Sequence, residues 1–199
     1  SDYLFCPTEI AFNTLIKEGI AKIKISQVSK PIIDVLIAYN KEIDNSNILT
    51  KFDLKPKNYF LCTEHRPENV ENIRNLSNIL KALENIYKKY GLPIIFPAHV
   101  RTQAAIKKFD LSVSKGINII DYLGFFAFSK LEKEALCLIT DSGTVQEDGC
   151  FFHVPCVTTR ISTERPETIH VGSNIVSGLE FNNIVKSVKI MVNKDRKWR

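Results

Sequence analysis

The sequence lacks the features that mark several common classes of protein. It has no apolar run of eighteen residues and no signal peptide, so we expect no membrane partner and a cytoplasmic location. Its five cysteines are an odd number without a CxxC pair, which indicates free thiols in a reducing compartment. The spacing of Cys150, His153 and Cys156 fits no common zinc site, and we expect neither a metal nor a cofactor.

A strong excess of charge is also missing. The net charge is +5, and the lysines are spread along the chain, apart from a basic tail after Lys186 that is typical of a solvated helix end. Nucleic-acid binders more often cluster basic residues on one element with interleaved aromatics, so we expect no nucleic-acid partner. With 199 residues, of which 44% are hydrophobic, the chain can bury one substantial core.

Apolar strands and amphipathic helices alternate from residue 59 onward. Strands separated by single helices imply a parallel sheet with right-handed crossovers. We therefore predict an α/β fold, a Rossmann-like parallel sheet flanked by helices, without the GxGxxG fingerprint of dinucleotide binding. The expected strands are 59–63, 93–97, 117–120, 136–140, 154–158 and 174–177, and the expected helices are 70–90, 102–109, 129–134, 145–151 and 182–193.

The first part of the chain has a different pattern. A helix stopped by Gly19 is followed by a second helix that Pro31 opens and that runs to about Ile43. The polar residues 44–57 then suggest a linker. We accordingly divide the chain into a leading segment, 1–57, and an α/β domain, 58–199.

A small polar turn, residues 141–144 (DSGT), lies between an apolar strand and a helix start. Gly143 can adopt backbone angles closed to other residues, while Ser142 and Thr144 supply hydroxyls. The N–H groups and the positive end of the helix would then face a ligand. This pattern fits an anion site, most often for phosphate, and fits an ordinary βα loop with a capping serine equally well.

The residues after the next strand favour the anion site. Arg160 and the run 163–167 (TERPE) place two arginines and two carboxylates within eight residues, which is unusual for a merely solvated face. Arginine is the common bidentate partner of phosphate, and carboxylates suit sugar hydroxyls. Together the two runs indicate a site for a phosphorylated sugar or nucleotide.

DSGTVQED followed by TERPE resembles the C-terminal half of the non-hydrolysing UDP-N-acetylglucosamine 2-epimerases. The resemblance implies that Asp148 holds the ribose, although the family usually has glutamate there; the shorter side chain can still accept a hydrogen bond from a hydroxyl. It also implies a set of residues that hold the UDP diphosphate, namely Ser142, Gly143, Thr144 and Arg165.

A second signature of the same family follows the strand that ends near Thr63. Residues 63–69 match T-x-H-R-x-E-N, and hydrolysing relatives carry a different sequence after their histidine. A histidine alone is more often structural or merely exposed. The resemblance implies that His65 touches the nucleotide-sugar and assists catalysis.

Two further matches involve fewer residues. Phe128 has the family's spacing from DSG for a phenylalanine beside the uracil, whereas the aromatic residues around it are by default core packing. Residues 97–99 resemble a PxH strand end, where the histidine and the arginine of HRxEN contact a second, activating UDP-sugar. Arg66 and His99 would be those residues here, and a polar residue that simply closes a strand accounts for His99 equally well.

The family resemblance implies the C-terminal domain of a two-domain GT-B fold, with residues 1–57 forming the end of the N-terminal domain and the crossover helices. It implies interconversion of UDP-N-acetylglucosamine and UDP-N-acetylmannosamine by elimination and re-addition of UDP, in an enzyme that is a homodimer at full length. The acidic residues that the family uses on the sugar are not in this chain. We therefore expect it to lack turnover alone.

Three alternatives stay open. The first is a 2-epimerase for another UDP-N-acetylated sugar, either a 6-deoxy sugar or a diacetamido uronic acid. The second is a GT-B glycosyltransferase domain, which would not be expected to carry HRxEN together with TERPE. The third is a non-catalytic sensor of nucleotide-sugars, which a turnover assay with a supplied N-terminal half would distinguish.

Overall fold

The structure of the chain, a computed structural model, describes residues 2–198 as two compact units that divide between Asp44 and Asn45. The domain boundary expected at residue 57 from the polar stretch before it stays a prediction. Among residues 2–198, no helix has both the length and the apolar character needed to cross a bilayer.

The first unit contains a short parallel pair of strands, β1 (Leu4–Cys6) and β2 (Ile25–Gln27). Helix α1 (Glu9–Lys17) connects them, and the Thr8 hydroxyl caps it by accepting from the backbone N–H of Ala11 at 3.2 Å. Strands of three residues are too short to show an alternating pattern, and the sequence did not indicate them. The single helix expected over 31–43 is two helices that meet at Tyr39, α2 (Pro31–Ala38) and α3 (Asn40–Asp44).

The second unit is built on a six-stranded parallel sheet, as the alternating pattern predicts. Its strand order is β5-β4-β3-β6-β7-β8, the order of the Rossmann fold. The chain runs outward from β3 to β5 and returns to place β6 on the other side of β3, so the order reverses between β3 and β6. The strands are β3 (Phe60–Thr63), β4 (Ile94–Pro97), β5 (Ile117–Ile120), β6 (Cys137–Thr140), β7 (Cys156–Thr158) and β8 (Asn174–Val176).

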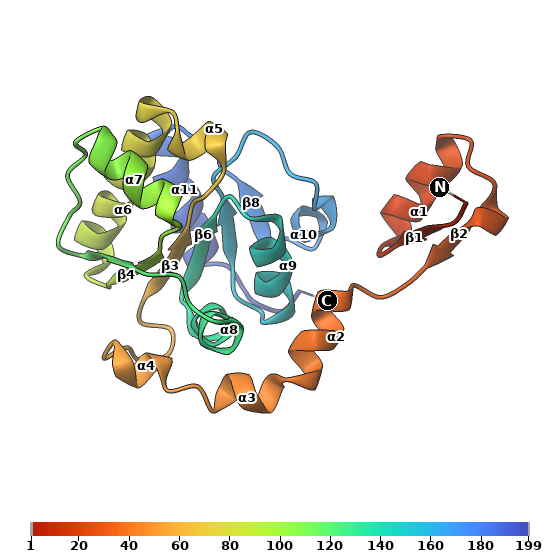
Figure 1. The fold of residues 1–199 in the computed structure, drawn as a ribbon, viewed down its shortest axis with the longest axis horizontal. Helices are drawn as coiled ribbons and strands as arrows, with labels where there is room; N and C mark the ends of the chain where they lie inside the picture. The colour runs from red at the N-terminus through yellow and green to blue at the C-terminus, as the bar shows by residue number, and fades with distance from the viewer. Residues whose placement is uncertain (1, 199) are drawn as a thin grey trace. The chain divides into compact units, whose positions relative to one another are not determined.

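Helices cover both faces of this sheet, and Figure 1 shows the two helical layers. Helices α6 and α11 pack against each other and against one buried apolar cluster, and α4, α8 and α9 contribute to a second cluster. The helices of this unit are α4 (Ile48–Lys51), α5 (Pro67–Val70), α6 (Ile73–Tyr90), α7 (Val100–Lys108), α8 (Phe125–Glu134), α9 (Gly143–Phe151), α10 (Pro166–His170) and α11 (Phe181–Val192).

Two expectations for the first part of this unit were wrong. The polar stretch expected as a linker contains α4, and its apolar residues Ile48 and Leu54 are buried in the second cluster, so the segment packs on the domain. The helix expected from residue 70 begins at Ile73, because the Asn72 side chain caps it by accepting from the N–H groups of residues 74 and 75. A separate short helix, α5, precedes it.

Candidate functional site

The site starts from the register of the central strands. Thr63 of β3 pairs with Thr140 of β6, which in turn pairs with Thr158 of β7. The hydroxyls of Thr63 and Thr140 lie 2.6 Å apart. Because these parallel strands end at the same level, the residues that follow them leave the sheet side by side at the switch point, where open α/β sheets bind ligands. Those residues are Glu64, Asp141 and Thr159.

Asp141 organises the loop after β3. It is fully buried, and its carboxylate accepts from the backbone N–H groups of His65 at 3.0 Å and Arg66 at 2.8 Å. The imidazole Nδ1 of His65 lies 3.1 Å from Oδ1 of the same carboxylate. Burial alone would raise the pKa of Asp141, but the hydrogen bonds from the His65 ring and the Arg66 backbone outweigh it and lower the pKa. Asp141 is therefore the ionised acid of this loop.

Glu64 is a second buried carboxyl beside Asp141, with 1% of its surface exposed. It accepts from the Thr159 hydroxyl at 2.5 Å and from the Asn69 side-chain amide at 3.0 Å. Burial, followed by the charge of Asp141, raises its pKa well above the usual range. Since Glu64 keeps its proton, the Glu64–Asp141 pair carries one negative charge, which lies on Asp141. The Thr102 hydroxyl donates to the Glu64 carbonyl at 2.6 Å and fixes the backbone of the loop.

The turn after β6 begins helix α9. Ser142 occupies the N-cap position, yet among the described residues its hydroxyl makes no capping hydrogen bond, so it is available to a ligand. Its backbone N–H donates to the Thr140 hydroxyl at 2.9 Å, and its carbonyl accepts from the Gln146 side chain at 3.0 Å. Thr144 is exposed in the first turn. The helix therefore presents its positive end and a free hydroxyl at the switch point.

Arg165 is held against the start of α9. Its backbone N–H donates to the Thr163 hydroxyl at 3.1 Å, and that hydroxyl donates to Gln146 of α9 at 2.6 Å. The guanidinium forms an ion pair with Glu147, which also belongs to α9. A cation with fixed donors thus lies beside the helix N-terminus, which is the combination that binds phosphate.

Charged side chains connect the two signatures. Glu164 accepts from Arg160 at 2.7 Å and from Arg66 at 3.3 Å, so the TERPE run touches the HRxEN loop directly. Arg66 also donates through Nε to the carbonyl of Asp141 at 3.0 Å. His65, the DSGT turn and Arg165 are therefore brought to one end of the sheet, although they lie far apart in the sequence.

Asp148 lies one turn further along α9 and faces Glu132 of α8. Both are buried, and their carboxyl groups interact directly with each other. Burial, followed by the charge of Glu147, raises the pKa of Asp148 to about 7. Burial and the charge of Asp148 raise the pKa of Glu132 well above its usual range. The sequence did not indicate Glu132, because a glutamate in an amphipathic helix is usually exposed.

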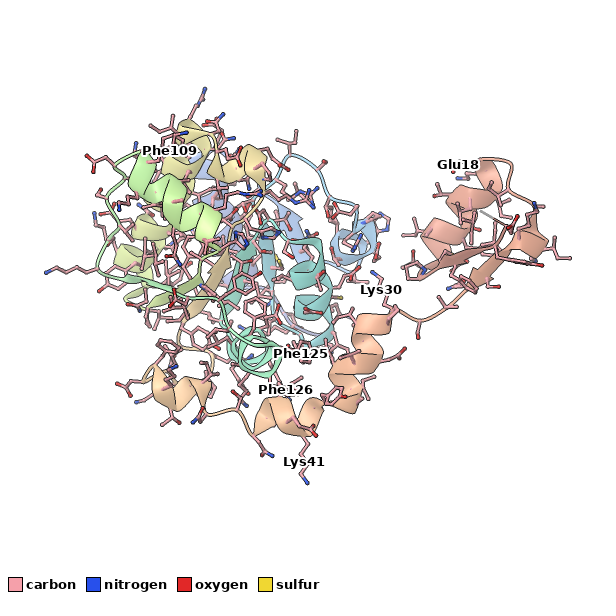
Figure 2. All side chains as sticks on the ribbon, viewed as in Figure 1. Glu18, Lys30, Lys41, Phe109, Phe125 and Phe126 are labelled. Atoms are coloured by element: carbon pink, nitrogen blue, oxygen red, sulfur yellow. The ribbon has the colours of Figure 1, made fainter. Side chains whose placement is uncertain are left out.

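The contacts of Phe128 and His99 differ from those of the hydrogen-bonded loops at the strand ends. The helix expected from residue 129 begins at Phe125, so Phe128 lies inside α8, where it packs against the second apolar cluster. Phe125 and Phe126 are instead the half-exposed rings of this segment, with 39% and 41% of their surfaces accessible (Figure 2). His99 caps α7 by accepting from the Arg101 N–H at 3.2 Å. Contact of Phe128 with uracil and of His99 with an activator stays a prediction.

Comparison with known proteins supports the same family. All 199 residues match the family model described as UDP-N-acetylglucosamine 2-epimerase. The UDP-N-acetylglucosamine 2-epimerase of Methanocaldococcus jannaschii is 43% identical over 100% of this chain and 56% of its own length. The UDP-2,3-diacetamido-2,3-dideoxy-D-glucuronate 2-epimerase of Pseudomonas aeruginosa is 32% identical over 98% of this chain and 53% of its own. The chain spans about half the length of the curated relatives it matches.

Solved structures of UDP-N-acetylglucosamine 2-epimerases are similar to this chain in fold. The M. jannaschii UDP-GlcNAc 2-epimerase in complex with UDP-GlcNAc and UDP matches with a TM-score of 0.92 and 43% identity, over 100% of this chain and 56% of that one. The UDP-N-acetylglucosamine 2-epimerase from Rickettsia bellii matches with a TM-score of 0.86 and 29% identity, over 100% and 53%. These likenesses confirm the expected fold class, a Rossmann-like parallel sheet flanked by helices as in the C-terminal domain of GT-B epimerases.

Proposed function

Because this chain belongs to the UDP-N-acetylglucosamine 2-epimerase family, we propose that it is the UDP-sugar-binding C-terminal part of an enzyme that interconverts UDP-N-acetylglucosamine and UDP-N-acetylmannosamine. The observation that carries this proposal is the position of Arg165 beside the N-terminus of α9, where an ion pair with Glu147 holds it. A diphosphate offers several oxygens to such a site. Backbone N–H groups, the Ser142 and Thr144 hydroxyls and the guanidinium would share them.

The remaining groups of the site fit the two ends of a UDP-sugar. Asp148 would accept a hydrogen bond from a ribose hydroxyl, as the family resemblance implies. Phe128 would lie beside the uracil, as the family resemblance implies. His65 lies at the neighbouring strand end, where it would meet the diphosphate or the sugar attached to it. Arg66 and His99 would serve the second, activating UDP-sugar.

The reaction removes the proton at C2 of the sugar while the bond from C1 to the UDP oxygen breaks, which leaves a double bond between C1 and C2. Re-addition of UDP and return of a proton to the other face give the epimer. Asp148, Glu164 and Glu167 are assigned to the nucleotide end of the ligand or to the strand–helix junction, and the Asp141 and Glu64 carboxyl groups are buried and hydrogen-bonded within the protein. We therefore assign binding of UDP to this chain and expect no turnover from it alone.

A second substrate is favoured by one comparison. The P. aeruginosa relative, 32% identical over 98% of this chain, is named for a UDP-diacetamido uronic acid. A panel of UDP-sugars tested on the full-length enzyme would separate this substrate from UDP-N-acetylglucosamine. We further propose that the enzyme acts in the cytoplasm, which the free state of its five cysteines supports, and that it is a homodimer at full length, which the family resemblance supports.

Calorimetry with UDP, UMP and ADP tests the proposed function. We expect UDP to bind more tightly than UMP, because the β-phosphate would meet Arg165 and the start of α9. We expect UDP also to bind more tightly than ADP, because the family resemblance implies a uracil, and not a purine, beside Phe128. Absence of heat with millimolar UDP on a folded sample, or equal affinities for all three nucleotides, would contradict the proposal.

A further inference from the structure

Asp141 has no role in the proposed function, although its carboxylate contacts the proposed catalytic histidine. The carboxylate is completely buried, while 43% of the His65 side chain is exposed. Oδ1 of Asp141 lies 3.1 Å from Nδ1 of the imidazole. One ring nitrogen is therefore directed into the protein, and the exposed part of the ring is left for a ligand.

We propose that Asp141 is a positioning residue that fixes the orientation and the tautomer of His65. In this arrangement Nδ1 carries a proton and donates it to Asp141, so that Nε2 is the nitrogen that meets the ligand. The identity of that ligand, a UDP-sugar, rests on the proposed function. The tautomer itself does not, because it follows from contacts within this chain.

The donors around Asp141 require Nδ1 of His65 to act as a hydrogen-bond donor. Oδ2 already accepts from three donors: the backbone N–H groups of His65 and Arg66, at 3.0 and 2.8 Å, and the Asn69 amide at 3.2 Å. Oδ1 faces the His65 N–H at 3.2 Å as well as Nδ1. A carboxylate surrounded by donors stays ionised and can only accept. The imidazole nitrogen that faces it must therefore be the one that bears hydrogen.

Glu64 and Asn69 keep the negative charge on Asp141. Glu64 is the buried neighbour that holds a proton, and the Asn69 amide bridges the two side chains by donating to Oε2 of Glu64 at 3.0 Å. The same amide donates to the Thr159 carbonyl at 2.9 Å, which ties the arrangement to the end of β7. The network thus fixes both the position and the charge state of the group behind His65.

This arrangement prepares His65 for contact with an anion. When the ring carries both protons, Nε2 is a donor directed away from the protein, while Nδ1 still donates to the buried carboxylate. When the ring is neutral, Nε2 is an acceptor. In both states the ring cannot turn without losing its bond to Asp141, so little orientational freedom is lost when a ligand binds.

Nitrogen-15 NMR of the imidazole rings tests the proposal on the 199-residue chain. The chain has four histidines, and a His65→Gln variant assigns the His65 signals. In alkaline buffer, where an imidazole is neutral, we expect the wild-type ring to show a protonated Nδ1 and an unprotonated Nε2. The reverse pattern, or an even mixture of the two, would overturn the proposal without any variant.

The Asp141→Asn variant provides a second test of whether Asp141 sets the tautomer of His65. Its amide oxygen would stay with the three donors around Oδ2, which places its NH₂ group against Nδ1 of His65. The ring must then accept at Nδ1, so the protonated signal should shift to Nε2. Glu68→Gln is the matched control, because Glu68 pairs with Arg66 at 3.6 Å rather than with the imidazole. It should keep the wild-type pattern.

The outcomes separate the two proposals. If Asp141→Asn folds and keeps a protonated Nδ1, Asp141 does not set the tautomer. If the wild-type ring shows a protonated Nδ1 but the chain does not bind UDP in calorimetry, the inference about Asp141 holds and the proposed function fails. If UDP binds and the wild-type ring has a protonated Nε2, the proposed function stands and the inference is wrong.

Discussion

Arg165 lies against the first residue of α9, with its guanidinium carbon 3.7 Å from the point where a Cβ on Gly143 would lie. The Glu164 carboxylate is closer still, with Oε1 2.6 Å from that point. The absence of a side chain at Gly143 therefore lets the TERPE run close over the helix N-terminus. This approach brings the TERPE run against the DSGT turn, where we propose that the anion binds.

Gly143→Ala should weaken UDP binding without unfolding the domain. Alanine suits a helix better than glycine, but its methyl group would push Glu164 aside and crowd Arg165. We expect a loss of about 1 to 2 kcal/mol, roughly 5- to 30-fold in Kd, measured by calorimetry. Gly124→Ala is the matched control, since nothing lies within 4 Å of a Cβ there. Equal losses in both variants would count against a specific role for Gly143.

Asp148 should make the site sensitive to the ribose hydroxyls. We expect wild-type chain to bind UDP more tightly than 2′,3′-dideoxy-UDP, because the dideoxy ligand cannot donate to the Asp148 carboxylate. At about pH 8, above the pKa of about 7 that Asp148 has in the folded chain, Asp148→Ala should bind the two ligands alike, having lost roughly 1.5–3 kcal/mol of UDP binding, the usual contribution of a hydrogen bond to a charged group. If the wild-type chain does not discriminate between the ligands, Asp148 does not contact the ribose.

The buried pair of Glu132 and Asp148 should make stability depend on pH. The pKa of Asp148 in the folded chain is about 7, above its ordinary value of 3.8. The folded state therefore holds protons more tightly than the unfolded state, and its stability should fall as pH rises from about 4 to about 7. Glu132→Met removes one of the two acids and should raise Tm more at about pH 8 than at about pH 5.

The gain expected for Glu132→Met at the higher pH is about 1–4 kcal/mol, the range seen when buried charged groups are replaced by apolar ones. Glu84→Met is the control, because Glu84 is a half-exposed residue of α6 that pairs with Lys88. Its effect should stay within about 0.5 kcal/mol at both pH values. A larger gain in stability for Glu132→Met at the lower pH would contradict the raised pKa values of Glu132 and Asp148.

The 199-residue chain should not epimerise a UDP-sugar. Removal of the C2 proton needs a base within hydrogen-bond reach of that carbon in a site that excludes water. The carboxylates Asp148, Glu164 and Glu167 are assigned to the nucleotide end or to the strand–helix junction, too far along the ligand to reach that carbon. Incubation with UDP-N-acetylglucosamine in D₂O should therefore show no deuterium at C2 by NMR. Deuterium incorporation by this chain that disappears in Arg165→Ala would show that a group of this chain can remove the C2 proton, against this prediction.

The sheet and most helices could be predicted from the sequence because the buried strands are continuous apolar runs and the long helices are strongly periodic. The strand over 117–120 has the expected limits, and others differ by one or two residues. Helix α10 could not be predicted, because five residues are too few to show a period. The start of α8 was placed late, since its first turn is composed of aromatic residues rather than strong helix formers.

The site could be predicted only in part. The DSGT, HRxEN and TERPE runs mark which residues lie at strand ends, but the contacts among them depend on the register that sets Thr63 beside Thr140. The role of Asp141 depends on donors from residues 65, 66 and 69, which no local pattern connects to it. Glu132 is buried only because α8 packs on α9. These contacts join residues that are far apart in the sequence, so they are set by the tertiary structure and not by a local pattern.

The central claim is that this domain holds the diphosphate of UDP between Arg165 and the N-terminus of α9. Calorimetric titration of UDP into wild-type chain and Arg165→Ala tests it most directly, with Arg74→Ala as the control because Arg74 is an exposed arginine that pairs with Glu180. We predict that Arg165→Ala loses about 1.5–3 kcal/mol of binding, roughly 10- to 150-fold in Kd, while Arg74→Ala binds as the wild type does. Equal affinity of wild type and Arg165→Ala, both folded, would contradict the account.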